Sequence, residues 1–202
     1  LVMTSLILLS SSVYADKIEL RDGNVIDNLT ITSAGFDTVK YKQEGVRAAQ
    51  SRPGSEVERI VWESTSSAFR RGLGYYEQGE FAKALQRLQQ EAKSKDKPWS
   101  GAAGYFLAIC LMDQAGGDSA KLGAAVTAFE GYMKDHKKDF YLPLAAEALS
   151  RCHLQMGDSG KAKSALQPLS SGKFGKTNKL LGKMGQAQIS LKEKDYNGAR
   201  KL

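Results

Sequence analysis

Histidine and cysteine are scarce in this chain of 202 residues, which contains two of each. Zinc-binding, phosphate-loop and Ser-His-Asp patterns are also absent, and an active site needs a nucleophile with a base, a carboxylate pair or a ligand cluster. His153 follows Cys152 directly, but neighbours on a helix point about 100° apart, so these two side chains cannot act together. The sequence therefore predicts a protein that is not an enzyme and has no metal ion or cofactor.

The two histidines and two nearby aspartates receive structural interpretations instead. His136 lies in the charged stretch KDHKKD and is predicted to be solvated. His153 is predicted to pack in the interior or at an interface. Asp135 and Asp139 lie four residues apart on one helical face, but the lysines around them are typical of an ordinary wet surface.

Long hydrophobic runs are lacking as well. A membrane-spanning helix needs about 20 apolar residues, and the apolar run near the N-terminus, Leu6 to Leu9, is much shorter. A serine spacer and small side chains at Val13 and Ala15 follow it, as in a secretory signal. We predict a signal peptide over residues 1–15, no transmembrane span in the mature chain from Asp16, and export to the periplasm or cell envelope. A buried N-terminal strand is the alternative.

The charge is unevenly divided along the chain. Residues 16–63 contain 7 Lys and Arg against 9 Asp and Glu, whereas residues 64–202 contain 22 against 13. This change in composition predicts a domain boundary near the stretch WESTSS. The basic excess of the second part favours acidic partners, such as an envelope polymer or an anionic membrane, and export makes nucleic acid an unlikely partner.

Residues 16–63 have the pattern of a small β domain. Short runs alternate apolar and polar residues, as half-buried strands do, and Asp22-Gly23 and Glu44-Gly45 can supply the positive φ of tight hairpins. The apolar members of these runs are Ile18, Leu20, Leu29, Ile31, Val39, Tyr41, Ile60 and Trp62. Four or five strands of this length predict a small barrel or sandwich, and residues 16–62 resemble Sm-like and tudor-like barrels. So small a domain is marginal alone, so we expect Trp62 to dock on the part of the chain after it.

Residues 64–202 have the pattern of a helical repeat. In GLGYYEQGEFAKALQRL, residues 72–88, a small residue precedes an aromatic one by three positions, a glycine turn follows, and an alanine precedes a bulky residue by four. This arrangement resembles the tetratricopeptide repeat, in which small residues let two antiparallel helices approach closely. Equivalent alanines recur 41, 37 and 37 residues apart, namely Ala84, Ala125, Ala162 and Ala199. The resemblance implies an α+β protein overall, with the β domain followed by an all-α superhelical solenoid of about three and a half repeats.

The repeats depart from the family pattern in several places. Ala108, Ser150 and Ala187 stand where glycine is usual, and the closing proline is mostly absent. The last repeat stops before its bulky residue, so we expect the chain to be a fragment of a longer array. In this register Cys110 and Cys152 are equivalent points of stacked helices, roughly 8–10 Å apart. That separation exceeds the limit of about 7 Å for a disulfide, and two buried free thiols are predicted.

The resemblance also implies where a partner would bind. In a tetratricopeptide array the first helix of each pair lines a concave groove, and its exposed residues contact the partner. The alternative is that the apolar members pack against neighbouring helices or the β domain. The residues at these positions are Phe69, Leu73, Tyr76, Glu77, Tyr105, Met112, Glu147, Arg151, Met184 and Gln188. A second candidate is a basic stripe, which a merely solvated face would also explain, formed by Lys173, Lys176, Lys179 and Lys183.

These observations favour a non-catalytic exported scaffold that binds a protein or an extended peptide in the groove, with the β domain as a cap or second contact surface. A first alternative is a regulatory or targeting module of a larger envelope enzyme or secretion machine, whose active part lies beyond Leu202. A second alternative is a polyanion-binding envelope protein, whose affinity would fall steeply as salt rises.

Overall fold

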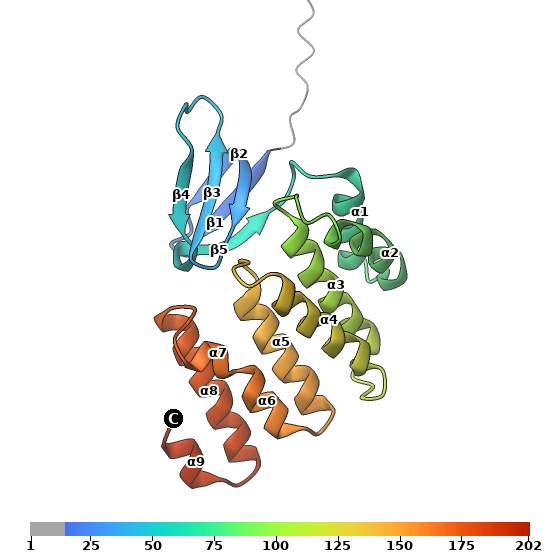
Figure 1. The fold of residues 1–202 in the computed structure, drawn as a ribbon, viewed down its shortest axis with the longest axis vertical. Coiled ribbons are helices and arrows are strands. Elements are labelled where there is room, and N and C mark those ends of the chain that lie inside the picture. The colour runs from blue at the N-terminus through green and yellow to red at the C-terminus, as the bar shows by residue number, and fades with distance from the viewer. Residues whose placement is uncertain (1–14) are drawn as a thin grey trace, which may run out of the picture.

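The computed structural model describes residues 15–202 as an α+β protein, in which an N-terminal antiparallel sheet is followed by helices (Figure 1). The predicted signal peptide lies outside the described residues, apart from Ala15. Within residues 15–202, every helix is too short or too polar to cross a bilayer.

The sheet has five strands in the order β4-β3-β2-β1-β5, and each neighbouring pair is antiparallel. Four of the strands coincide with the predicted alternating runs, and Gly23 and Gly45 have φ values of +87° and +78° in their turns, as predicted. The fifth was not among those runs, because the sequence QSRP does not alternate. The strands are β1 (Asp16–Leu20), β2 (Val25–Ala34), β3 (Thr38–Gln43), β4 (Gln50–Pro53) and β5 (Val57–Val61).

The prediction of a closed barrel or a sandwich is wrong, because the strands form one open sheet. The strands β4 and β5 are its two edges and do not pair with each other. They are joined by the 3-10 turn η1 (Gly54–Glu56), and a link of this length spans at most roughly 15 Å. The sheet therefore curls enough to bring one end of each edge strand close, but the hydrogen bonds that would close a barrel are missing.

Nine helices are described within residues 15–202, and each packs against the next along the chain. The helices α1, α3 and α5 also contact one another in that order, as the succession from green to orange in Figure 1 shows. Their bounds are α1 (Ser67–Glu77), α2 (Phe81–Ala92), α3 (Ser100–Ala115), α4 (Leu122–Asp135), α5 (Leu142–Gln155), α6 (Ser159–Ala165), α7 (Gln167–Ser170), α8 (Lys176–Lys192) and α9 (Tyr196–Arg200).

The same turn closes three of the helices. Gly79, Gly157 and Lys194 have positive φ values of 74°, 81° and 63° at equivalent positions, which confirms the predicted turn at Gly79. The next residue in each turn donates its amide to the carbonyl oxygen five residues earlier, at 2.8 Å in all three cases. This is the hydrogen bond of a Schellman motif, which glycine favours because it has no Cβ.

The predicted alanines lie where helices meet. Ala84, Ala125 and Ala162 are fully buried, and Leu88 and Phe129, four residues after the first two, are fully buried as well. The close approach of α1 and α2 depends on Gly72, where an added Cβ would lie 3.0 Å from Leu88 Cδ2. The loop 116–121 joins α3 to α4 and lies within the longest of the three alanine spacings, from Ala84 to Ala125.

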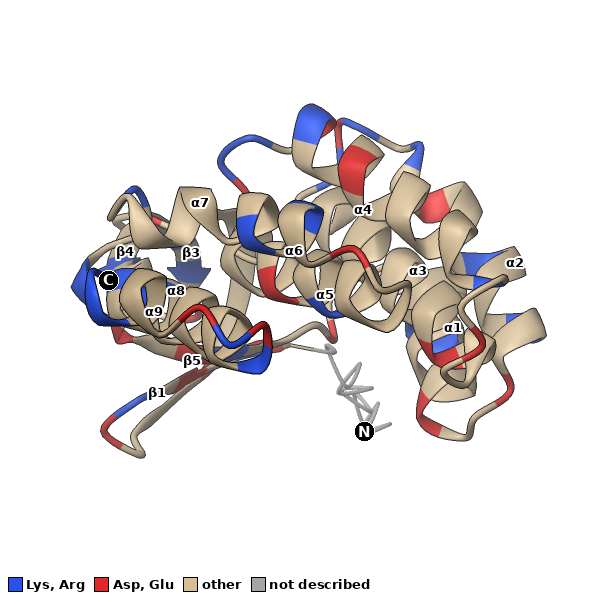
Figure 2. Cartoon of the chain, turned by 90° about the horizontal axis from the view of Figure 1, so that it is seen from below, with Lys and Arg blue, Asp and Glu red and all other residues tan. Residues whose placement is uncertain are grey.

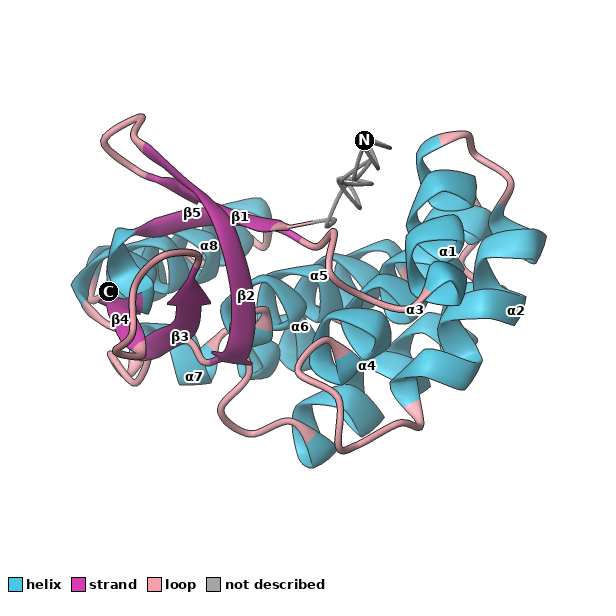
Figure 3. Cartoon of the chain, turned by 90° about the horizontal axis from the view of Figure 1, so that it is seen from above, coloured by secondary structure: helices cyan, strands magenta, loops and turns pink. Residues whose placement is uncertain are grey.

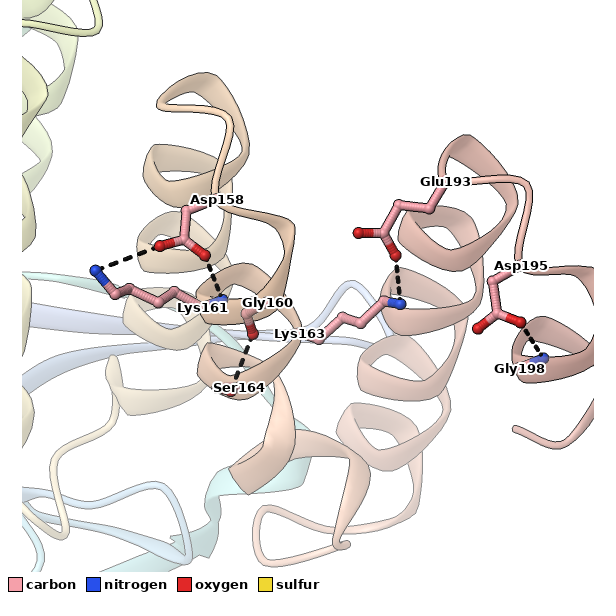
Figure 4. Close-up of polar contacts among 8 residues, drawn as sticks. All are labelled: Asp158, Gly160, Lys161, Lys163, Ser164, Glu193, Asp195 and Gly198. Carbon is pink, nitrogen blue, oxygen red and sulfur yellow. Dashed lines mark hydrogen bonds and ion pairs between the residues drawn. The ribbon is translucent and has the colours of Figure 1, made fainter.

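The helices α6 and α9 both begin with an aspartate that caps the N-terminus (Figure 4). Asp158 accepts a hydrogen bond from the Lys161 amide before α6, and Asp195 accepts one from the Gly198 amide before α9, both at 2.9 Å. Each side chain thereby satisfies a helix N–H that has no partner within the helix. Between these two caps, Lys163 Nζ lies 2.6 Å from Glu193 Oε2 and links α6 to the end of α8.

The sheet and the helices meet at a buried junction, which we call the seam. The indole Nε1 of Trp62 donates to the Tyr141 hydroxyl at 3.2 Å, which confirms that Trp62 docks on the helical part. The ring of Phe36 packs edge-to-face on Phe174, with centroids 4.8 Å apart. The Asp16 carboxylate is buried and accepts hydrogen bonds from Ile31, Glu63 and Ser64. The seam is therefore built from both apolar and polar contacts.

The prediction that Asp139 lies on a wet surface is wrong, because the seam encloses its carboxyl group. Asp139 Oδ1 accepts hydrogen bonds from the Tyr132 hydroxyl at 2.5 Å and from the Tyr141 amide at 2.9 Å. Its backbone forms an isolated bridge to Gly35 of the sheet. Desolvation by burial raises the pKa of the Asp139 carboxyl above its ordinary value. The lysines on either side of it in sequence gave no indication of this enclosure.

Candidate functional site

A cleft with a volume of about 720 Å3 lies between strand β5 and the helices α1, α3 and α5. We call it the β5 cleft. The chain leaves β5 and enters α1 through the loop that follows Trp62, as Figure 3 shows. The sheet and the helical part therefore each form one wall, and neither forms the cleft alone. Ligand pockets typically have volumes of about 300–1,000 Å3.

The helical wall of the β5 cleft is aromatic. Tyr105 stacks on Tyr141 with ring centroids 4.8 Å apart and an interplanar angle of 13°. Phe106 lies against Tyr76 and Tyr105 at 6.1 and 5.3 Å. Leu73 of α1 completes this apolar surface. Because α1 and α3 contribute two of these side chains each and Tyr141 directly precedes α5, the packing of the helices holds the aromatic wall in place.

The tyrosines of this wall are neutral at physiological pH. Burial raises the pKa of Tyr105 to about 12, and burial followed by the Asp113 carboxylate raises the pKa of Tyr76 as well. The Tyr76 hydroxyl donates to Asp113 Oδ2 at 2.9 Å, which holds the ring against α3. The wall therefore offers apolar and hydrogen-bonding surface but no charge of its own.

The charged residues of the β5 cleft are mainly acidic. Four glutamates and two arginines line it, although the whole chain has a net charge of +7. Arg59 pairs with Glu19 at 2.6 Å, and its hydrogen bond holds the pKa of Glu19 below the ordinary value. Arg70 is turned toward the carbonyl oxygens of Glu63 and Thr65. The other two glutamates are Glu58 and Glu77.

Four of the predicted groove residues line the β5 cleft, namely Leu73, Tyr76, Glu77 and Tyr105. Three more, Glu147, Arg151 and Gln188, line a second hollow of about 430 Å3 among α5, α6 and α8. Arg151 also lines a third hollow of about 300 Å3, together with Met112. These eight residues therefore lie on α1, α3, α5 and α8 and line three separate hollows.

The remaining two groove residues lie elsewhere. Phe69 is fully buried, so its side chain belongs to the core and is not available to a partner. Met184 is 50% exposed and lines none of the three hollows. It belongs instead to an exposed apolar face on α8, which Leu180, Leu181 and Leu191 extend.

The predicted basic stripe lies at the C-terminal end of the described chain, away from the β5 cleft. Figure 2 shows basic residues in blue beside this end of the chain. Lys173 lies over the Phe174 ring at 5.4 Å, and Lys183 donates to the Leu202 carbonyl oxygen at 2.7 Å. Lys176 and Lys179 are exposed on α8. The basic and acidic surfaces of the molecule are therefore separate.

The interior of the helical part holds no activated nucleophile. The predicted free thiols are confirmed, since Cys110 and Cys152 are both buried and unpaired. Burial raises the pKa of Cys110 to about 11 and raises that of Cys152 too, so both remain thiols. His153 is buried as predicted, and His136 stacks on Tyr132. Within residues 15–202, His, Cys, Asp and Glu form no group of three that could hold a metal ion.

Some residues of the β5 cleft were not predicted. Phe106 and Tyr141 carry much of the aromatic wall, and strand β5 forms the opposite side. Their sequence neighbourhoods contain no motif, and strand β5 comes to face them only because Trp62, at its end, bonds to Tyr141. The pairing of Trp62 with a helical partner was the only signal that pointed to this junction.

Comparison with models of known protein families finds no match for this chain, and comparison with curated proteins finds none either.

Proposed function

We propose that the protein is a non-catalytic binding scaffold that recognises an extended peptide, or an extended segment of another protein, in the β5 cleft. The observation that carries the proposal is the cleft itself, which joins an aromatic wall to a strand edge. Aromatic side chains supply large contact areas at low cost in conformational entropy. A cleft lined by large aromatic side chains in this way suits the recognition of an extended ligand.

The proposal includes the architecture of the helical part, which we take to be a tetratricopeptide-like solenoid. Two observations support this: each helix packs on the next, and the same turn recurs after α1, α5 and α8. In a solenoid each repeat contacts only its neighbours, and the stack presents a rigid concave surface. In this proposal the sheet packs beside the stack of helices, through Tyr141, Asp139 and Phe174, and supplies one wall of the binding site.

The proposed setting is the periplasm or cell envelope, as the signal-like residues 1–15 suggest. A scaffold exported in this way would collect envelope proteins through their extended segments. The test of export is a fusion of the full chain to a reporter that is active only outside the cytoplasm. Loss of reporter activity when Leu6 to Leu9 are changed to glutamate would support the proposal, and unchanged activity would contradict it.

The binding proposal is tested by filling the β5 cleft. Gly74 lines the cleft, and an added Cβ there would meet nothing within 4 Å. We therefore expect Gly74→Trp to fold normally while its indole occludes the site. Gly131 on α4 has the same open surroundings but lies outside the cleft, so Gly131→Trp is the matched control.

The ligands for this test come from a phage-displayed library of random peptides, selected on the purified full chain. We expect selected peptides to bind Gly74→Trp at least tenfold more weakly than wild type, and Gly131→Trp within twofold of wild type. Equal binding to both variants, or no enrichment of any peptide, would show that the cleft is not a peptide site.

A further inference from the structure

The edge of strand β5 is open toward the cleft. Among residues 15–202, β5 pairs only with β1, and it is the last strand of the sheet. Side chains of successive strand residues point to opposite faces. The cleft is lined by five successive residues, 58–62, so it includes the edge of the strand, and it also reaches Glu19 on the neighbouring strand β1. An edge of this kind presents unpaired backbone N–H and C=O groups.

The position of this edge decides what can pair with it. The facing wall of the cleft consists of Leu73, Tyr76 and Tyr105, carried by α1 and α3. A second sheet would have to place its own layer of side chains between β5 and these helices, whereas a single extended chain needs only one strand spacing of about 4.8 Å. Residues 58–62 can pair with about five residues of such a chain, which would extend about 17 Å.

The charge of the cleft indicates the composition of that chain. Glu19 pairs with Arg59, and Glu58 pairs with Arg21 at 2.7 Å. No ion pair within 4 Å joins a basic side chain to Glu63 or Glu77 in the described part of the chain, and both line the cleft. A cationic chain would therefore gain two carboxylate partners, whereas an acidic chain would be repelled.

We infer that the β5 cleft takes a cationic peptide by strand addition to β5, so that alternate apolar side chains rest on the aromatic wall while lysine or arginine side chains approach Glu63 and Glu77. In β-strand addition the backbone hydrogen bonds supply affinity and alternate side chains supply specificity. This inference rests on the proposed function and adds to it the backbone geometry and the charge of the ligand.

The probe for the test is a synthetic peptide, acetylated and amidated, with the sequence Lys-Val-Lys-Tyr-Lys-Val-Lys. Its alternation places the apolar side chains on one face of a strand and the lysines on the other. Three control peptides are used. One replaces all lysines by glutamate, and the other two carry methyl groups on the backbone amides of alternate residues, one for each of the two alternating sets. Binding to the full chain is measured by calorimetry, and backbone protection by hydrogen exchange.

We expect the lysine peptide to bind and the glutamate peptide to bind at least tenfold more weakly. Of the two methylated peptides, the one whose methyl groups block the amides that face β5 should not bind. Hydrogen exchange should slow in residues 58–62 and remain unchanged in β4, the other edge of the sheet, which does not line the cleft. Glu77→Lys should weaken binding at least tenfold. Glu130→Lys, an exposed change on α4, should leave it within twofold.

Two results would overturn the inference and leave the broader proposal standing. The first is binding that Gly74→Trp abolishes but that neither protects β5 nor responds to methylation, since the peptide would then occupy the cleft without pairing. The second is failure of the lysine peptide to bind while library peptides of acidic or neutral composition do. Failure of every library peptide would instead remove the proposed function itself.

Discussion

The sheet meets the helices in two contrasting ways, at the seam and at the β5 cleft. In the seam, buried polar groups find partners across the junction: Trp62 bonds to Tyr141, and Gly35 forms a bridge to Asp139. At the cleft, the strand edge and the aromatic wall face each other across a volume of about 720 Å3. The sheet is therefore bonded to the helical part at the seam, while the edge of the sheet at β5 has no further strand paired with it.

This difference separates stability from binding. A buried polar group without a partner costs about 1–3 kcal/mol, so changes in the seam should lower the free energy of unfolding. Changes on the surface of the cleft remove no internal contact of that kind and should affect ligand binding instead. Substitutions in the seam test this separation.

The largest effect is expected for Asp16→Ala. Its carboxylate accepts hydrogen bonds at 2.7–2.8 Å from the amides of Ile31, Glu63 and Ser64 and from the Ser64 hydroxyl. Removing a buried acceptor leaves these donors without a partner, and a loss of about 3–5 kcal/mol in the free energy of unfolding is expected. Urea denaturation followed by circular dichroism measures it.

Asp96 provides the control, because it is exposed in the loop before α3. Surface substitutions of this kind change stability by about 0.5 kcal/mol or less. If Asp16→Ala were as stable as Asp96→Ala, the hydrogen bonds around Asp16 would not anchor the start of the helical part, and the seam would lose its main polar element.

The next effect is expected for Gly101→Ala, which intrudes on the seam from α3. An added Cβ would lie 1.8 Å from Asp139 Oδ2, so the carboxyl group would have to move away from Tyr132 and Tyr141. Overpacking of this kind costs about 1–3 kcal/mol. Gly123→Ala on α4 is the matched control, since its Cβ would meet nothing within 4 Å.

The two alanine variants should change the melting temperature in opposite directions. Alanine is favoured over glycine in helices by up to about 1 kcal/mol at interior positions. Gly123 is the second residue of α4, so Gly123→Ala should raise the melting temperature slightly while Gly101→Ala lowers it. Higher melting temperatures for both variants would mean that Asp139 can leave its place without cost.

Local sequence predicted most of the helices and strands but, of the seam, only the docking of Trp62. The turn at Gly79 and the buried Ala84 and Leu88 were predictable because the residues that specify them lie within ten positions of one another. The strand β4 was missed because QSRP lacks alternation, and its pairing with β3 comes from the hairpin that precedes it. Closure of the sheet was wrongly expected for a similar reason, since the order of strands at the two edges depends on long-range pairing.

The candidate site was predictable only on its helical side. Leu73, Tyr76, Glu77 and Tyr105 follow from the repeat register, because that register determines which face of a helix is turned to the groove. The open edge of β5 cannot be predicted from the sequence in this way, because a strand is an edge only when no other segment pairs with it. Asp139 was misjudged because its surroundings depend on the fold: its carboxyl group is desolvated between Tyr132 and Tyr141, and its backbone bridges Gly35, which lies more than one hundred positions earlier in the chain.

The burial of Asp139 predicts a dependence of stability on pH. The pKa of Asp139 is higher in the folded state than in the unfolded state, where it is about 3.9. At pH values between the unfolded and the folded pKa, the native protein therefore binds more protons than the unfolded protein. Stability therefore falls as pH rises through that window and levels off above it. Each unit of pKa difference corresponds to about 1.4 kcal/mol.

The variant Asp139→Asn removes this titration and keeps an oxygen for Tyr132 and Tyr141. We expect the free energy of unfolding of Asp139→Asn, relative to wild type, to increase between pH 4 and pH 7. His136, which also lies near Asp139, is present in both proteins, so the comparison isolates the change at position 139. Parallel curves for the two proteins would show that the Asp139 carboxyl ionises as easily in the folded chain as in the unfolded one.

The smallest effect concerns the single hydrogen bond from Trp62 Nε1 to the Tyr141 hydroxyl. A double-mutant cycle of Trp62→Phe and Tyr141→Phe separates this bond from the packing of the two rings, and a coupling of about 1 kcal/mol is expected for a buried neutral pair. Tyr196→Phe, at a side chain that is 67% exposed, should leave stability unchanged. Because both Trp62 and Tyr141 also line the β5 cleft, a coupling near zero would mean that apolar contact alone holds the sheet here. At Trp62 and Tyr141, which belong to both the seam and the β5 cleft, the distinction between hydrogen bonds that stabilise the fold and a surface that binds a ligand would then not hold.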